Sequence, residues 1–296
     1  MMPLRQHGRF PYTPINARPV YDWPNGKRLA VYIALNVETF PFGEGLGPDL
    51  NPKQPEPDVV NHGWRDWGNR VGIWNLLELM DELNLPAAAL TNTAVYDHHP
   101  QIMHALRSRG DEVVGHGRTN AERACDFSPQ AEAQMVVDCV ARIAAEEGGK
   151  PAGWMSPWVN QSAHTPELLA QAGLRYTLDW PMDDQPIRMA TANGPLWALP
   201  YARPTNDISA LHGAKMPPRQ WVETLFDAFD GMLDLSRRRP LVFNLSLHPY
   251  LIGHPHRLKP FRRFLEHLVA HRQDVWITQP RHICEHVDRL SLAGKL

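Results

Sequence analysis

Strand and helix patterns alternate along almost the whole chain, and this alternation restricts its fold more than any other feature. Short apolar runs bounded by turn residues predict strands, and apolar residues at helical spacing predict helices. The predicted strands are LAVYIALNV (29–37), AAALT (87–91), EVVGHG (112–117), GWMSPW (153–158), YTLDW (176–180), LWALPY (196–201), PLVFNLSLHP (240–249) and DVWIT (274–278). Such alternation is typical of parallel strands joined by right-handed crossovers. The sequence therefore predicts an α/β protein.

Helices are predicted between these strands. Their expected ranges are 71–83, 100–108, 128–147, 165–172, 218–238 and 260–271, with a last helix from Pro280. Ser128 is the expected N-cap of the third helix, Thr165 that of the fourth, and Gly110 the terminator of the second. No glycine-rich dinucleotide fingerprint follows the first strand, so we favour a TIM-like barrel over an open sheet.

The chain of 296 residues shows no internal repeat, linker or low-complexity segment, so we predict one barrel domain over residues 1–296. Residues 1–25 are expected to form an N-terminal extension. The stretch from Pro41 to Trp67 is rich in Gly, Pro and Asp and lacks periodicity, which predicts a long active-site loop over 40–67.

Charge and hydropathy argue against two classes of binding partner, nucleic acids and membranes. The formal charge of -2 is unlike the basic footprint of a nucleic-acid binder. No apolar run reaches the ~18–20 residues that span a bilayer, and the N-terminus lacks the apolar core of a signal peptide. We therefore expect a cytoplasmic protein that contacts neither nucleic acid nor membrane. Cys125, Cys139 and Cys284 are expected to be reduced, although Cys125 and Cys139 could pair.

Reactive and aromatic side chains follow four predicted strands, at the carboxyl ends where a parallel barrel places its active site. They are Asn36 and Glu38; His116, with Arg118, Asn120 and Glu122 just after it; Ser156 and Trp158; and His248. Taken singly, each has a structural explanation, such as a solvated acid for Glu38 or a core histidine for His248. Together, a carboxylate and two histidines can activate water and protonate a leaving nitrogen.

The same residues carry a family resemblance. The segments LNVET, HGRTN, GWMSPW and LSLH resemble four motifs of the polysaccharide deacetylase superfamily, over about Trp23 to Val287. Glu38 matches the catalytic base, and His116 and His248 match motif histidines. Thr39 and Asn120 stand where the family has metal ligands, and Met155 stands where it has an arginine. The resemblance implies a distorted β/α barrel of the deacetylase type.

These departures resemble a branch of metal-independent allantoinases and cyclic imide hydrolases. NRVGIWNLLEL (69–79), LDWPMDDQP (178–186), PTND (204–207) and LHPYLIGHPHR (247–257) also fit that branch. The resemblance implies opening of a small cyclic imide or ureide by water, and a homo-oligomer, either a tetramer or a dimer. We expect no cofactor; a divalent metal such as zinc, if present, would be held by Glu38, His116 and His248.

The expected roles are specific. Glu38 takes the proton of the attacking water, His116 orients that water or the carbonyl, and His248 stabilises charge or protonates the departing nitrogen. Residues expected to bind substrate are Arg70, Asn120, Glu122, Trp158, Asp183 and Asp184. For Arg70, a structural ion pair is an equal alternative. The competing functions are a metal-dependent deacetylase of N-acetyl sugars and a non-catalytic binding protein on the same fold.

Overall fold

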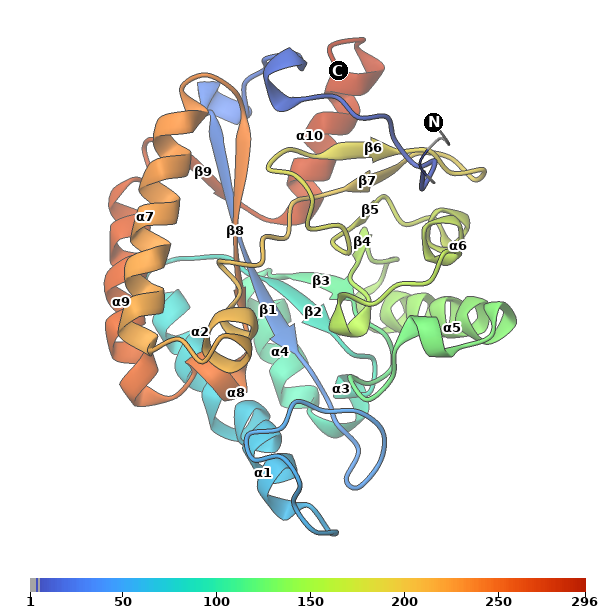
Figure 1. Cartoon of the computed structure of the whole chain (residues 1–296), viewed down its shortest axis with the longest axis vertical. Helices are drawn as coiled ribbons and strands as arrows, with labels where there is room; N and C mark the ends of the chain where they lie inside the picture. The colour runs from blue at the N-terminus through green and yellow to red at the C-terminus, as the bar shows by residue number, and fades with distance from the viewer. Residues whose placement is uncertain (1–3, 5) are drawn as a thin grey trace.

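The computed structural model describes residue 4 and residues 6–296, and all statements below concern these residues. A curled sheet of nine strands forms the centre of the described chain (Figure 1). The strands are β1 Leu29–Val37, β2 Ala88–Thr91, β3 Glu112–Gly115, β4 Gly153–Trp154, β5 Tyr176–Thr177, β6 Ile187–Met189, β7 Leu196–Ala198, β8 Leu241–Leu247 and β9 Val275–Thr278. Their order is β6-β7-β5-β4-β3-β2-β1-β8, and β9 pairs with the first half of β1.

All strand pairs are parallel except β6 with β7, which confirms the predicted distorted β/α barrel. In β1, Leu29 faces Leu241 of β8 and Val37 faces Thr91 of β2. Strand β6 was not predicted. The Asn193-Gly194 turn between β6 and β7 is a hairpin signal that the strand assignment overlooked.

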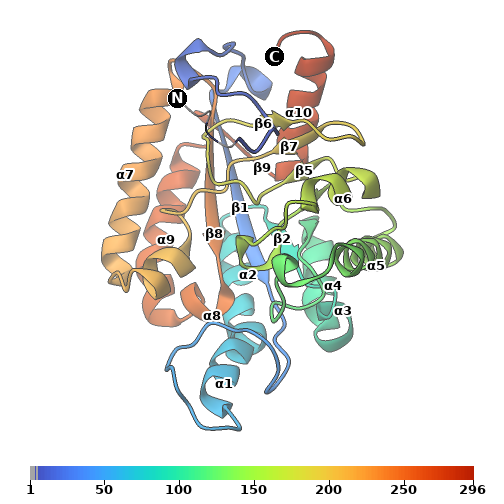
Figure 2. The same ribbon diagram turned by 45° about the vertical axis from the view of Figure 1, so that its right-hand side comes forward.

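Helices surround the sheet (Figure 2). Helices α7 and α9 lie on the flank next to β8, and α5 and α6 lie on the opposite flank. The helices are α1 Val59–Trp67, α2 Ile73–Glu82, α3 Val95–His98, α4 Pro100–Arg109, α5 Pro129–Glu147, α6 Thr165–Ala172, α7 Pro218–Ser236, α8 Pro249–Ile252, α9 Pro255–Ala270 and α10 Pro280–Leu292. Two short π-helices span Gly68–Gly72 and Ile208–Gly213. Within the described chain, no helix has the length and apolarity needed to cross a bilayer.

Most helix ends follow the predicted caps. Ser128 accepts the amide of Ala131 to begin α5, and Gly110, with φ of 72°, ends α4. Thr165 is not a cap, because its hydroxyl accepts the amide of Ser162 and donates to Glu132. The stretch 40–67 is only partly a loop: Asp58 accepts the amide of Asn61 and begins α1.

Side chains alternate strictly between two faces along β1. Leu29, Val31, Ile33, Leu35 and Val37 pack outward against the helices, in a core cluster that includes residues of α2, α4, α7 and α9. Ala30, Tyr32 and Ala34 pack inward with residues of the opposite barrel wall. Because the period is two, Asn36 and Glu38 continue the inward row. In β8, Val242 begins a row that reaches His248 in the same way.

Candidate active site

Three strand ends bring one carboxylate and two imidazoles together inside the barrel mouth. Oε1 of Glu38 lies 3.6 Å from Nε2 of His116 and 3.7 Å from Nε2 of His248. All three side chains are buried. These distances exceed direct hydrogen bonds, and a water or a substrate atom can bridge them. The structure thus brings together the three residues that the sequence nominated as catalytic.

The Glu38 carboxylate is stabilised in its ionised form. Burial acts to raise its pKa, but His248, His116 and the Tyr250 hydroxyl together hold the pKa below its ordinary value. The Tyr250 hydroxyl donates to Oε2 of Glu38 over 3.1 Å. The side-chain amide of Asn69 donates to the Glu38 carbonyl over 2.7 Å and fixes the backbone at this point. Glu38 is therefore a charged acceptor at neutral pH, as a general base must be.

His248 is oriented by Asp207, a residue that the sequence analysis did not nominate. Nδ1 of His248 donates to Oδ1 of Asp207 over 2.6 Å, and the backbone amide of His248 donates to Oδ2 over 2.8 Å. Burial acts to lower the pKa of His248, but the carboxylates of Asp207 and Glu38 raise it above its ordinary value. The two carboxylates therefore favour the protonated imidazole, whose Nε2 lies 3.7 Å from Oε1 of Glu38.

His116 is held by a backbone carbonyl. Its Nδ1 lies 2.7 Å from the Met155 carbonyl, which can only accept, so Nδ1 carries a proton and donates it. Its Nε2 is buried without a hydrogen-bond partner among the described residues and lies 3.6 Å from Oε1 of Glu38. Near this ring, Asp179 accepts the amide and the hydroxyl of Ser156, and burial raises the pKa of Asp179 to about 6. Two imidazole nitrogens and a carboxylate thus surround the same space.

Three further residues frame the approach to Glu38. The backbone amide of Asn120 donates to the backbone carbonyl of Thr39 over 3.0 Å. The Trp158 indole donates to the backbone carbonyl of Asn120 over 3.0 Å. Trp158 has a backbone φ of 65° and a half-exposed ring. The buried oxygens of the Thr39 hydroxyl and the Asn120 amide have no partner in the described structure. Asn120 and Trp158 therefore lie where substrate groups could contact them.

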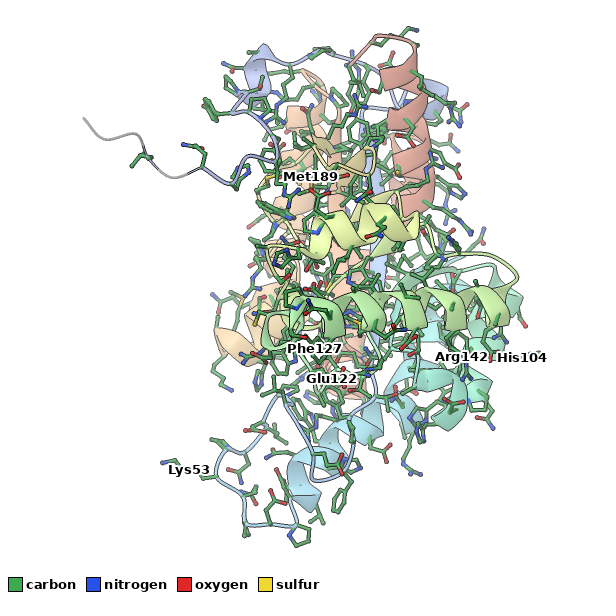
Figure 3. The ribbon with its side chains drawn as sticks, turned by 90° about the vertical axis from the view of Figure 1, so that its right-hand side faces the viewer. Lys53, His104, Glu122, Phe127, Arg142 and Met189 are labelled. Atoms are coloured by element: carbon green, nitrogen blue, oxygen red, sulfur yellow. The ribbon has the colours of Figure 1, made fainter. Side chains whose placement is uncertain are left out.

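The other predicted substrate-binding residues lie elsewhere. Arg70 is exposed and pairs with Asp66 one turn earlier, which is the structural alternative considered for it. Glu122, labelled in Figure 3, pairs with Arg118 at 3.0 Å on the surface. Both side chains are engaged with oppositely charged neighbours and do not contact Glu38, His116 or His248.

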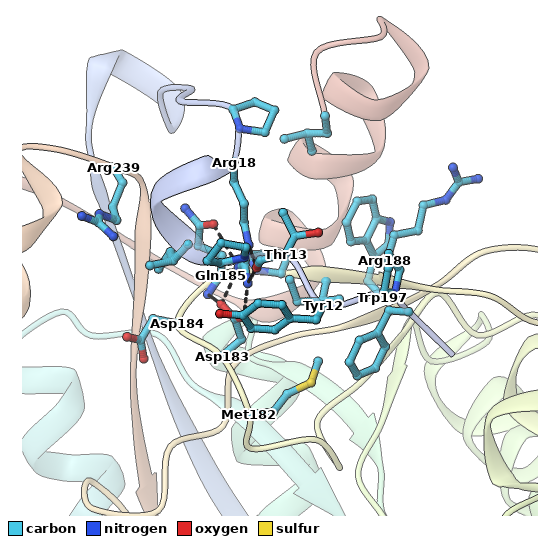
Figure 4. Close-up of a pocket in the computed structure, with 18 of the residues that line it drawn as sticks. Tyr12, Thr13, Arg18, Met182, Asp183, Asp184, Gln185, Arg188, Trp197 and Arg239 are labelled. Atoms are coloured by element: carbon cyan, nitrogen blue, oxygen red, sulfur yellow. Dashed lines mark hydrogen bonds and ion pairs between the residues drawn. The ribbon is translucent and has the colours of Figure 1, made fainter. Parts of the chain in front are cut away.

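Asp183 and Asp184 line a pocket beside the N-terminal segment (Figure 4). Arg18 binds Asp183 through both guanidinium nitrogens, at 2.7 and 2.6 Å, in a pocket lined by the N-terminal segment. The Asp184 carbonyl accepts the amide of Val242 at the beginning of β8, whereas His248 follows the end of that strand. The length of strand β8 therefore separates Asp183 and Asp184 from His248. The structure corrects the prediction that these two carboxylates bind the substrate.

The structure adds Asp207, Tyr250 and Asn69 to the site. Asp207 ends the PTND segment, Tyr250 follows His248 by two residues, and Asn69 begins the NRVGIWNLLEL segment. All three lay in segments that carried the family resemblance, which was the available signal. Their roles depend on contacts between strands far apart in sequence, so no local pattern could assign them.

The donor set for a metal is limited to one carboxylate and two imidazoles. Neutral Thr39 and Asn120 occupy the neighbouring positions, and Tyr250 already donates to the carboxylate. In the described part of the chain, no three His, Cys, Asp or Glu side chains are arranged to hold a metal ion. These residues do not fit a tightly bound metal, and we derive no step through one. Cys125, Cys139 and Cys284 are free thiols, with Cys125 exposed.

Comparison with known proteins gives relatives over nearly the whole chain, although no family model matches. A Schizosaccharomyces pombe protein provisionally named a polysaccharide deacetylase is 23% identical, covering 92% of this chain and 93% of its own. The peptidoglycan deacetylase of Helicobacter pylori is 23% identical, covering 76% of this chain and 86% of its own. The structure of PuuE allantoinase superposes with a TM-score of 0.79 at 24% identity, covering 89% and 91% of the two chains.

The chain is therefore similar in sequence to two proteins named as deacetylases, and it shares its distorted β/α barrel with PuuE allantoinase. The relatives include both an allantoinase and deacetylases. The choice between these reactions therefore depends on the chemistry of the site.

Proposed function

We propose that the chain is a hydrolase of non-peptide carbon–nitrogen bonds that opens a small cyclic imide or ureide by attack of water. One observation carries the proposal: Glu38 lies between two imidazoles, each held through its Nδ1 by a separate acceptor, while neutral Thr39 and Asn120 occupy the neighbouring positions. This arrangement supplies a base and an acid from the chain's own residues. Imide carbonyls are more electrophilic than ordinary amides, which suits such a site.

In this scheme, Glu38 accepts a proton from a water that bridges its carboxylate and Nε2 of His116. The water oxygen attacks the ring carbonyl, and the ring C–N bond breaks. Nε2–H of His248 stabilises the charge on the oxygen and then protonates the departing nitrogen. The sum is addition of one water across one C–N bond. The flat indole of Trp158 can stack on the substrate ring. The homo-oligomer expected from the resemblance stays a prediction.

Hydrolysis of an N-acetyl sugar is the second candidate. The similarity to a peptidoglycan deacetylase over 76% of this chain favours it. It uses the same base and acid on an exocyclic amide and releases acetate.

A substrate panel with and without a strong chelator distinguishes these functions. The panel contains succinimide, maleimide, phthalimide, hydantoin, dihydrouracil, allantoin and an N-acetylglucosamine oligomer. Ring opening is followed by loss of imide absorbance and by mass, and acetate release reports deacetylation. We expect chelator-resistant opening of at least one ring. Acetate release without ring opening would refute the proposal and favour the deacetylase, and chelator-sensitive opening would require a metal in the scheme.

A further inference from the structure

A half-buried arginine lies beside the candidate site and forms no salt bridge with the described residues. Arg65, on α1, makes one hydrogen bond to a described residue, from Nη1 to the Pro48 carbonyl at 3.4 Å. Its guanidinium lies 4.9 Å from the centre of the Phe40 ring, two residues after Glu38. Its Nε is buried and has no hydrogen-bond partner among the described residues. Burial lowers the pKa of Arg65, while the charges of Asp49 and Asp58 act to raise it, and a half-buried cation without a hydrogen-bonded anion is costly unless a ligand completes it.

Arg65 lines a small, partly open cavity whose wall includes Thr39, the residue after Glu38. The cavity has a volume of about 20 Å³ and is lined by Thr39, Phe40, His62, Arg65, Asp66, Asn69 and His99. Three polar atoms of its lining are buried and unpartnered: the Thr39 hydroxyl, Nδ1 of His62 and Nε of Arg65. This volume holds about one oxygen-sized atom. The Asp66 carboxylate also lines the cavity, but its charge is balanced by Arg70.

Resting on the proposed function, we infer that this cavity is a subsite for a carboxylate oxygen of the substrate, and that Arg65 selects rings bearing a carboxylate. The guanidinium supplies the charge and Nε–H, and the Thr39 hydroxyl supplies a second donor. Asn69, which donates to the Glu38 carbonyl, links the cavity wall to the catalytic strand end. The subsite therefore fixes the ring relative to Glu38.

The test compares rings that differ only by a carboxylate: dihydroorotate with dihydrouracil, and hydantoin-5-acetate with 5-methylhydantoin. The wild-type protein prefers the carboxylated member in kcat/KM. Arg65→Met lowers that preference about 10- to 100-fold, chiefly through KM, because a charge-assisted hydrogen bond is lost. Arg65→Lys restores part of it. Arg262→Met, which removes an arginine paired with Glu82 on another helix, leaves the preference unchanged.

A binding measurement separates this inference from the proposed reaction. Titration calorimetry gives Kd for the same four rings with Glu38→Gln protein and with the Glu38→Gln, Arg65→Met double variant. If wild-type protein opens no ring but carboxylate binding still depends on Arg65, the proposed reaction fails and the subsite stands. If Arg65→Met weakens both members of a pair equally, or neither, the subsite is overturned.

Discussion

Replacing Asp207 with Asn tests how His248 is held and charged. The Asp207 carboxylate accepts both the ring Nδ1–H and the backbone amide of His248, and one Asn oxygen cannot replace both acceptors. A unit charge at ~4 Å contributes up to about 4 kcal/mol at an effective dielectric constant near 20, or about 3 pK units. Oppositely charged neighbours at this range shift a pKa by about 1–3 units. Burial acts to lower the pKa of His248, and the Asp207 charge opposes this effect. Asp207→Asn should therefore lower the pKa of His248 by about 1–3 units.

The assay is the pH dependence of kcat/KM for the best ring substrate. In the wild type, the acid form of His248 persists above pH 6.5, so activity is lost only as pH rises through its raised pKa. In Asp207→Asn, this alkaline limb moves about 1–3 units towards acid, and activity at neutral pH falls by at most the corresponding factor of about 10 to 10³. Asp183→Asn, at the far end of the barrel, is the matched control. An unmoved alkaline limb in Asp207→Asn would refute the assigned role of His248.

Two further predictions concern other buried acids. Tyr250→Phe removes the hydrogen bond to the Glu38 carboxylate and raises the pKa of Glu38. The acid limb of the pH profile of kcat/KM therefore moves to higher pH, and an unmoved limb would contradict this prediction. Burial raises the pKa of Glu112 to about 7, so the native state binds an extra proton and the free energy of unfolding falls by about 3 kcal/mol as pH rises from 4.5 to 7. Glu112→Gln should lose this slope in urea unfolding at pH 5 and pH 8, and an unchanged slope would contradict it.

The barrel was predictable because long apolar runs identify its long strands in the sequence. The largely apolar runs of β1 and β8 are buried on both faces and have few alternatives. Glu38 and His248 were nominated because they follow the carboxyl ends of these two strands. Strands of two residues, such as β4 and β5, were placed correctly but drawn too long, because the hydrogen-bonded ladder stops where the chain turns into loops.

Charged residues in loops were harder to place. Arg70 and Arg65 lie five residues apart in one helical stretch, and nothing in the sequence says which one is exposed. Asp183 looked like a ligand for ring N–H groups, but a partner 165 residues away, Arg18, takes its carboxylate. Such pairings depend on tertiary contacts rather than on local pattern. Predictions of substrate contacts therefore need the structure, whereas the grouping of Glu38, His116 and His248 at one end of the barrel was predicted from the sequence.

The most direct test of the account is the rate of ring opening by Glu38→Gln, with kcat and KM measured in the presence of a chelator. Glutamine keeps the size of Glu38 and can accept from Tyr250, but it cannot take a proton from water. The account predicts a fall in kcat of about 10²- to 10⁴-fold with a folded protein and little change in KM. Near-normal turnover by this variant would contradict the role of Glu38 as the base and with it the proposed reaction.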